Sequence, residues 1–176
     1  MDFGLLIIEL LKIVLPALIV AAAMFYLVKT HLDRDYQRKL LELKVGNARA
    51  VIPVRLQAYE RVCLFLERIS PSNMLIRIPG SAVSATEYHR ILLTEIRDEF
   101  NHNASQQVYM SQQTWDQVKR AKEDLVTLIN RCQHQMNERS KGTELAKRIL
   151  ETVITEETEP TANALVAVKR EIQVLF

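Results

Sequence analysis

The sequence predicts a mainly α-helical protein: an N-terminal transmembrane helix that continues into a stalk, followed by a bundle of about five amphipathic helices. Three observations support this fold class. Residues 13–28 form an uncharged apolar run, the whole chain contains only four glycines, and apolar residues after the run recur every three or four positions. We therefore assign residues 1–28 to a transmembrane anchor, residues 29–52 to a juxtamembrane stalk helix and residues 53–176 to a helical bundle.

The apolar run needs an extension to cross a membrane. Residues 13–28 fall slightly short of the ~20 apolar residues that span a bilayer. Extending the run back to about Leu6 adds only two charged residues, Glu9 and Lys12, which lie three apart on a helix and can pair. Pro16 is compatible with a membrane helix, where the freed carbonyl group finds a local partner. A transmembrane span of residues 6–28 follows.

Two other interpretations of the apolar run are open. A cleaved signal peptide needs a basic beginning, but the first eleven residues carry only Asp2 and Glu9 as charges. Residues 21–23 are three alanines that resemble a cleavage site, yet the apolar run continues through them to Val28. The second alternative is a buried core helix of a soluble domain. We favour the anchor over both.

Charge predicts the orientation of the anchor. Residues 29–49 carry six basic and three acidic side chains, whereas the N-terminal flank offers Lys12 against Asp2 and Glu9. The positive-inside bias then places the N-terminus outside and the C-terminal bundle in the cytoplasm, in the inner membrane of a cell. Basic side chains next to the anchor are expected to contact lipid headgroups. These predicted membrane-surface contacts are Lys29, Arg34, Arg38 and Lys39.

Five amphipathic helices are predicted in the bundle, at about residues 53–69, 86–100, 111–138, 143–155 and from about 161 to the end. Pro53 is expected to end the stalk helix and to begin the next one, because proline removes a backbone donor. Ser84 and Glu87 match a capping box at a helix start.

Two short segments are ambiguous. Residues 74–78 and 108–110 are short and contain β-branched or aromatic residues, so each is interpreted as a very short strand or an extended connector. If both are extended they can pair. The two cysteines, Cys63 and Cys132, lie on apolar helix faces and are expected to be buried free thiols of a reducing compartment.

The C-terminal helix ends without a charged tail. Its apolar residues follow helical spacing, and the last three residues are Val-Leu-Phe. An apolar end of this kind is expected to dock, either onto the bundle itself or onto a partner. The candidates for partner docking are Leu165, Val168, Ile172, Leu175 and Phe176.

Catalytic and ligand-binding signals are weak. Glu99 and His102 form a single E-x-x-H unit, whereas a di-iron bundle needs two such units and two further carboxylates. No glycine-rich phosphate loop or zinc-type Cys/His spacing occurs, and a net charge of +2 does not favour nucleic-acid binding. We predict neither an enzyme nor a cofactor or metal site. The alternative is a small-ligand sensor or enzyme that uses residues 89–102, with His89, Glu95 and Asp98 as its ionisable groups.

Residues 59–78 (YERVCLFLERISPSNMLIRI) and residues 87–124 resemble an uncharacterised family of short bacterial single-pass membrane proteins with a cytoplasmic helical region. The resemblance implies a bacterial inner-membrane setting and carries no activity. Together with the amphipathic helices and the basic stalk, it leads to one functional expectation. The protein is expected to be a membrane-anchored helical interaction module, an accessory subunit or scaffold of a membrane complex. Its expected partners are the lipid bilayer and either another protein or a second copy of itself.

Overall fold

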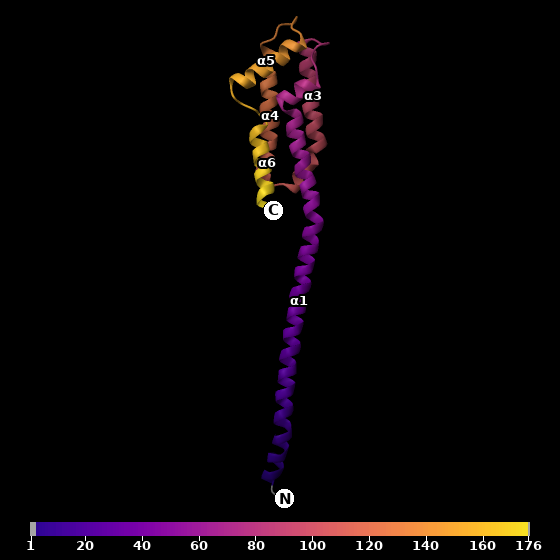
Figure 1. The fold of residues 1–176 in the computed structure, drawn as a ribbon, viewed down its shortest axis with the longest axis vertical. Coiled ribbons are helices and arrows are strands. Elements are labelled where there is room, and N and C mark those ends of the chain that lie inside the picture. The colour runs from indigo at the N-terminus through magenta and orange to yellow at the C-terminus, as the bar shows by residue number, and fades with distance from the viewer. Residues whose placement is uncertain (1–2, 176) are drawn as a thin grey trace. The chain divides into compact units, whose positions relative to one another are not determined.

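The computed structural model describes residues 3–175, and it describes the side chains of residues 11–12, 14–42, 45–46 and 49–174. The internal contacts divide the chain into two compact units, Met1–Val51 and Ile52–Phe176. One helix, α1 (Phe3–Ile69), begins in the first unit and ends in the second. Figure 1 shows this helix and the shorter helices that follow it.

The first unit consists of the N-terminal part of α1. The segment Val14–Glu42 of this helix, near the N-terminus, is long and apolar enough to cross a membrane, and none of its most apolar window is buried. The predicted N-terminal apolar helix is therefore confirmed. The exposure of its side chains does not agree with the alternative of a buried core helix: Phe25, for example, is 72% exposed.

The predicted helix boundary at Pro53 is wrong. Helix α1 continues through Gly46 and Pro53 without interruption, and its C-terminal residues enter the core of the second unit. Proline costs a helix interior about 3 kcal/mol, through one lost backbone hydrogen bond and one steric clash, but its fixed φ angle is itself helical. The helical turns on both sides outweigh this local cost, so stalk and first bundle helix form a single element.

The second unit is the predicted helical bundle, and this prediction is confirmed. Helices α3 and α4 lie beside each other, α6 packs along α4, and α5 contacts α2, α3 and α4. Together with the last residues of α1, from Tyr59 to Ile69, they enclose one apolar core, whose largest fully buried residues include Tyr59, Phe65, Tyr88, Leu92, Leu125 and Ile129. The remaining elements are α2 (Pro71–Arg77), α3 (Ala85–Asn103), the 3₁₀ helix η1 (Ala104–Tyr109), α4 (Gln112–His134), α5 (Gly142–Thr155) and α6 (Ala162–Leu175).

The two segments considered as strands are helical. Residues 74–77 belong to α2, where the Met74 amide donates to the Ser70 carbonyl at 2.8 Å and the Ile78 amide donates to the Met74 carbonyl at 2.9 Å. Residues 108 and 109 belong to η1, and Met110 follows it. Proline at the first turn of α2 and the burial of Met74 and Leu75 favour a helical turn over the strand that β-branched residues suggested.

Side-chain caps fix the beginnings of α3 and α4. The Ser84 hydroxyl accepts a hydrogen bond from the Glu87 amide at 3.2 Å, as the capping-box pattern predicted. The Ser111 hydroxyl accepts from the Thr114 amide at 3.2 Å in the same way. Each cap satisfies one of the free amides at a helix start, and this places the first residues of α3 and α4.

A close contact between two glycines joins α5 to the segment before α3. A Cβ atom on Gly80 would lie 2.6 Å from the carbonyl carbon of Gly142, a distance that real Cβ atoms do not reach. The Gly142 amide donates to the Val83 carbonyl, and the Ala85 amide donates to the Ser140 carbonyl, both at 2.9 Å. Two chain segments about sixty residues apart therefore touch backbone to backbone, which requires glycine on both sides.

Candidate functional site

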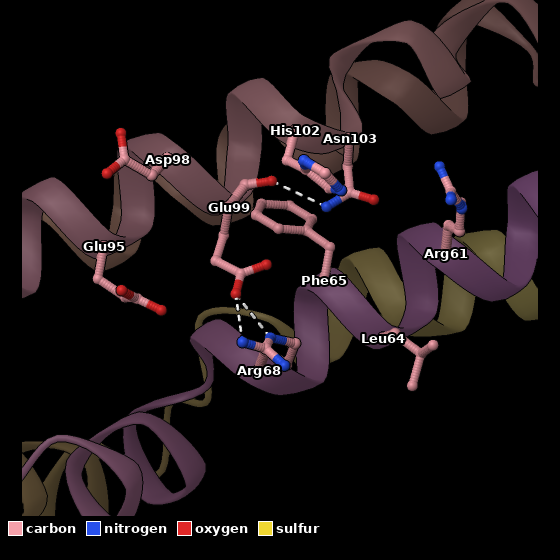
Figure 2. A pocket seen from close by; sticks show the side chains of 9 residues that line it. All are labelled: Arg61, Leu64, Phe65, Arg68, Glu95, Asp98, Glu99, His102 and Asn103. Carbon is pink, nitrogen blue, oxygen red and sulfur yellow. Dashed lines mark hydrogen bonds and ion pairs between the residues drawn. The ribbon is translucent and has the colours of Figure 1, made fainter.

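A groove of about 490 Å³ lies between the last turns of α1 and the C-terminal half of α3 (Figure 2). Its two walls have the same helical spacing. Arg61, Leu64 and Arg68 line it from α1, and Glu95, Asp98 and His102 line it from α3. The remaining lining residues are Phe65, Glu99 and Asn103, so that the groove combines acidic, basic and imidazole side chains.

Two of the carboxylates in the groove are already paired with arginines. Glu99 accepts from Arg68 at 2.6 Å, and its backbone carbonyl accepts from the Asn103 amide side chain at 2.8 Å. Glu95 forms an ion pair with Arg77. These ion pairs hold α3 against α1 and α2. Because an arginine balances the charge of each carboxylate, neither carboxylate is free to pair with a ligand.

Other polar side chains in the groove are open to a ligand. Among the interactions of the described residues, no hydrogen bond or ion pair engages Arg61, Asp98 or His102. The apolar lining residues are Phe65, which is buried, and Leu64, which is 51% exposed. The groove therefore offers one exposed aliphatic side chain with cationic and anionic side chains around it, a mixture suited to a charged peptide or a small polar molecule.

The ionisable side chains that were considered together within residues 89–102 do not all lie in one site. His89 hydrogen-bonds through Nε2 to Asn130 Oδ1 of α4 at 2.7 Å, whereas Glu95, Asp98 and His102 line the groove with α1. Within the residues whose side chains are described, no group of three His, Cys, Asp or Glu residues is arranged to hold a metal ion. Glu99 of the E-x-x-H unit serves instead as the partner of Arg68.

Glu171 connects three helices of the bundle, and no local sequence pattern indicated this role. Its carboxylate accepts three hydrogen bonds of 2.7 Å, from the Tyr59 hydroxyl, the Ser111 amide and the Ser111 hydroxyl. Burial alone would raise the pKa of Glu171, but hydroxyl and amide donors outweigh that effect and hold the pKa below its ordinary value. One carboxylate thus connects α6 to α1 and to the start of α4. The donors that lower the pKa of Glu171 are the side chains of Thr114, Tyr59 and Ser111 and the Ser111 amide.

The C-terminal docking candidates are mainly used inside the bundle. Val168 is fully buried, and Leu165 and Ile172 are partly buried and pack against the core. These three side chains therefore face α6's own bundle rather than a free surface. The side chain of Leu175 and all of Phe176 lie outside the described residues.

The predicted membrane-surface residues lie in the first unit. Lys29, Arg34, Arg38 and Lys39 are all exposed on α1, so their charged groups can reach a surface beside the helix. The predicted thiols lie in the bundle and are free. Cys132 is buried and Cys63 is partly buried, and burial raises the pKa of the Cys63 thiol, which makes it a poor nucleophile.

The groove residues of α1 follow a helical spacing that is visible in the sequence. Arg61, Leu64 and Arg68 repeat at i, i+3 and i+7 on the face opposite the buried Tyr59, Leu66 and Ile69 stripe. That spacing identifies a second helix face but not what lies opposite it. Only the packing of α3 on α1, through the edge-to-face contact of Phe65 and Phe100, converts this face into a groove.

The chain therefore combines a helix that is long and apolar enough to cross a membrane with a helical bundle that carries a groove lined by acidic and basic side chains. The chain belongs to a family of unknown function (DUF7935), whose sequence profile matches residues 5–175. The prediction of an uncharacterised family is thereby confirmed. No curated protein and no solved structure matches the chain.

Proposed function

We propose that this protein is a single-pass membrane protein whose helical bundle is an interaction module of a membrane complex, as an accessory subunit or scaffold. One observation carries the proposal: the apolar segment of α1 has no protein around it, since none of its most apolar window is buried. Apolar surface transferred from water gains about 25 cal/mol for every Å² that is covered. A bilayer supplies that cover along the whole segment.

The charge distribution supports one orientation in that membrane. The exposed basic residues Lys29, Arg34 and Arg38 follow the apolar run, and they favour the side of the membrane with anionic lipid headgroups. The bundle then lies in the cytoplasm and the N-terminus outside, in a bacterial inner membrane. Thiol labelling tests the orientation. A single cysteine is introduced as Asp2→Cys in a variant that lacks the two native cysteines, and its accessibility from outside the cell is measured. Labelling of intact cells by an impermeant maleimide is expected, and protection from it would reverse the assignment.

The role of the bundle is inferred from its surface. Large aliphatic side chains stand out on separate elements, with Ile76 of α2 82% exposed and Val108 of η1 79% exposed. The groove between α1 and α3 adds an open cation, an open carboxylate and an open imidazole. Surfaces that combine exposed aliphatic groups with unpaired charges suit partner binding, because the partner covers the former and pairs with the latter.

Purification in mild detergent tests the interaction role directly. The tagged full-length protein is solubilised from membranes, and proteins that co-elute in stoichiometric amounts are identified. The variant Leu64→Asp together with Asp98→Lys changes the groove, and Ile154→Asp together with Glu151→Lys makes matched changes on the exposed side of α5. Loss of a partner with the groove variant alone assigns the groove. A protein that elutes alone as a monomer would contradict the interaction role.

A second candidate function is a membrane-tethered small-ligand sensor or enzyme that uses residues 89–102. The groove volume and its lining of Asp98, His102 and Arg61 are the observations that favour it. The triple variant Glu95→Ala, Glu99→Ala and His102→Ala should then abolish ligand binding while circular dichroism shows unchanged helicity. Because two arginines lose their partners in this variant, Asp98→Asn with His102→Gln is the milder companion. A change in stability alone would eliminate this candidate.

A further inference from the structure

A second concave surface of the bundle lies between α3 and α4, and we call it the α3–α4 slot. Its volume is about 430 Å³, and its lining residues are different from those of the groove between α1 and α3. The lining residues of α3 run from Leu93 to Asn101, and those of α4 run from Lys122 to Thr127. The slot is therefore about 12 Å long on α3, at 1.5 Å per residue.

The interior of the slot is apolar and preformed. Ile96 is buried, and Leu93, Phe100 and Val126 are partly buried and pack against the core. The ring of Phe100 stacks on the ring of Trp115, with their centroids 5.7 Å apart. Stacked aromatic pairs of this kind are favourable, so the core itself holds the Phe100 ring in position. The slot thus has a rigid apolar wall before anything binds to it.

Three hydrogen-bond donors of the slot are open. Arg97 and Asn101 lie one turn apart on α3, and Lys122 lines the slot from α4. Among the side chains that the structure describes, none forms a hydrogen bond or an ion pair with these three. The ammonium group of Lys122 lies instead over the ring of Phe100, 4.6 Å from its centroid. This cation–π contact places a positive charge above the apolar interior.

The balance of charge in the slot is positive. Among the described residues that line it, Glu123 is the one carboxylate, against the two cations Arg97 and Lys122. Other cations of the same two helices are already paired, since Arg90 contacts Glu87 at 3.0 Å and Lys119 contacts Asp116 at 2.7 Å. An anion that enters the slot therefore meets two cations that no carboxylate of the bundle has neutralised.

We propose that the α3–α4 slot binds a small organic anion, a carboxylate that carries an apolar chain of medium length. The carboxylate pairs with Arg97 and Lys122 and accepts a hydrogen bond from Asn101, while the chain covers Leu93 and Val126. The slot volume lies within the range of about 300–1000 Å³ that is typical of small-molecule sites. The length of the slot accommodates an extended octanoate. The site depends neither on the membrane role nor on the groove with α1.

Isothermal titration calorimetry at pH 7 tests the site on the full-length protein in lipid nanodiscs. Empty nanodiscs provide the blank, because a bilayer also takes up apolar solutes. The three probes are octanoate, the neutral octanamide, and acetate, which lacks the apolar chain. Each probe is titrated under the same conditions, so that charge and chain are tested separately.

Two variants remove one cation each from the slot, Arg97→Gln and Lys122→Gln. The matched controls are Arg90→Gln and Arg120→Gln, which remove an exposed cation from the same two helices outside the slot. Circular dichroism verifies that all four variants retain the helicity of the wild type.

We expect octanoate to bind the wild type about tenfold more tightly than octanamide or acetate, because only octanoate supplies both the charge and the chain. Each slot variant should weaken octanoate binding about five- to tenfold, whereas the controls leave it unchanged. Equal affinity for octanoate and octanamide would overturn the proposal. Equal losses in the slot variants and the controls, or the absence of saturable octanoate binding to the wild type, would also overturn it.

Discussion

At the scale of single residues, Glu171 connects α6 to α1 and to the start of α4. Its carboxylate accepts from Tyr59 on α1 and from both the amide and the hydroxyl of Ser111, each at 2.7 Å. Hydrogen bonds to a charged group contribute more than neutral ones, and the loss of one partner leaves the others unsatisfied. The C-terminal helix thus depends on a polar contact as well as on its apolar stripe.

The variant Glu171→Gln is expected to lower the free energy of unfolding by about 1–3 kcal/mol, because an amide retains the shape but loses the charge. Urea unfolding of the full-length protein in mild detergent measures this change. Glu60→Gln, an exposed carboxylate on α1, is the matched control and should change stability little. Equal effects of the two variants would contradict the assigned role of Glu171.

The effect of Glu171 should depend on pH in one direction. Since the pKa of Glu171 in the folded protein lies below the ordinary value of 4.5, its stabilisation is fully present above that value. It is lost as pH falls below 4.5 and the carboxylate takes up a proton in the folded state. The stability difference between wild type and Glu171→Gln, measured from pH 7 down to pH 3, should therefore shrink on acidification. A difference that grows towards low pH would have the wrong sign.

A second prediction at the residue scale concerns Gly80. Gly80→Ala should destabilise the bundle by about 1–3 kcal/mol, the usual cost of overpacking, because the new Cβ atom would meet the backbone of Gly142. Gly46→Ala is the control, since a Cβ atom there meets nothing within 4 Å. Thermal unfolding of both variants provides the comparison. The account of the glycine contact fails if the two substitutions have the same effect.

At the scale of elements, local signals predicted the starts of α3 and α4 well, the helix start at Pro53 wrongly and the tertiary contacts poorly. The Ser84 cap was visible in the sequence because it involves residues three apart. Residues 74–78 were misjudged because β-branched composition suggested a strand, whereas Pro71 and the burial of Met74 set a helical turn. The groove could not be predicted, since it unites Arg61 with side chains more than thirty residues away. The Gly80–Gly142 contact is non-local in the same way.

Continuity of α1 at Pro53 produces a prediction of its own. In the interior of a helix, Pro53→Ala restores a backbone hydrogen bond and should stabilise the helix by up to about 3 kcal/mol. At a helix start, which the sequence had suggested, proline is favourable and the same change should have little effect or destabilise. Thermal melts followed at 222 nm separate the two cases. A lower melting temperature for Pro53→Ala would support a break in α1 after all.

At the scale of the whole molecule, the proposed function gives the two units separate tasks. The first unit is an exposed apolar helix with a basic stalk, and the second is a bundle with its own core and groove. Composition along the chain was sufficient to predict an N-terminal apolar helix followed by a helical bundle, because a long uncharged run is a one-dimensional signal. Partner binding requires side chains that only the fold brings together.

We propose that the apolar segment of α1 spans a membrane. Two lysines on one face of this segment, Leu18→Lys with Ala22→Lys, cost about 5–7 kcal/mol of insertion free energy at roughly 3 kcal/mol each. Gln37→Lys with Leu41→Lys adds the same charge with the same spacing in the stalk. Intact mass of the purified wild type verifies that residues 1–28 are retained, which a cleaved signal peptide would exclude.

Alkaline extraction of membranes that contain each form of the full-length protein is the most direct measurement. If α1 spans the membrane, the wild type and the stalk variant remain in the membrane pellet, and the Leu18→Lys, Ala22→Lys variant moves to the supernatant. Release of the wild type by alkali, or retention of the double-lysine variant in the pellet, would contradict a membrane-spanning α1.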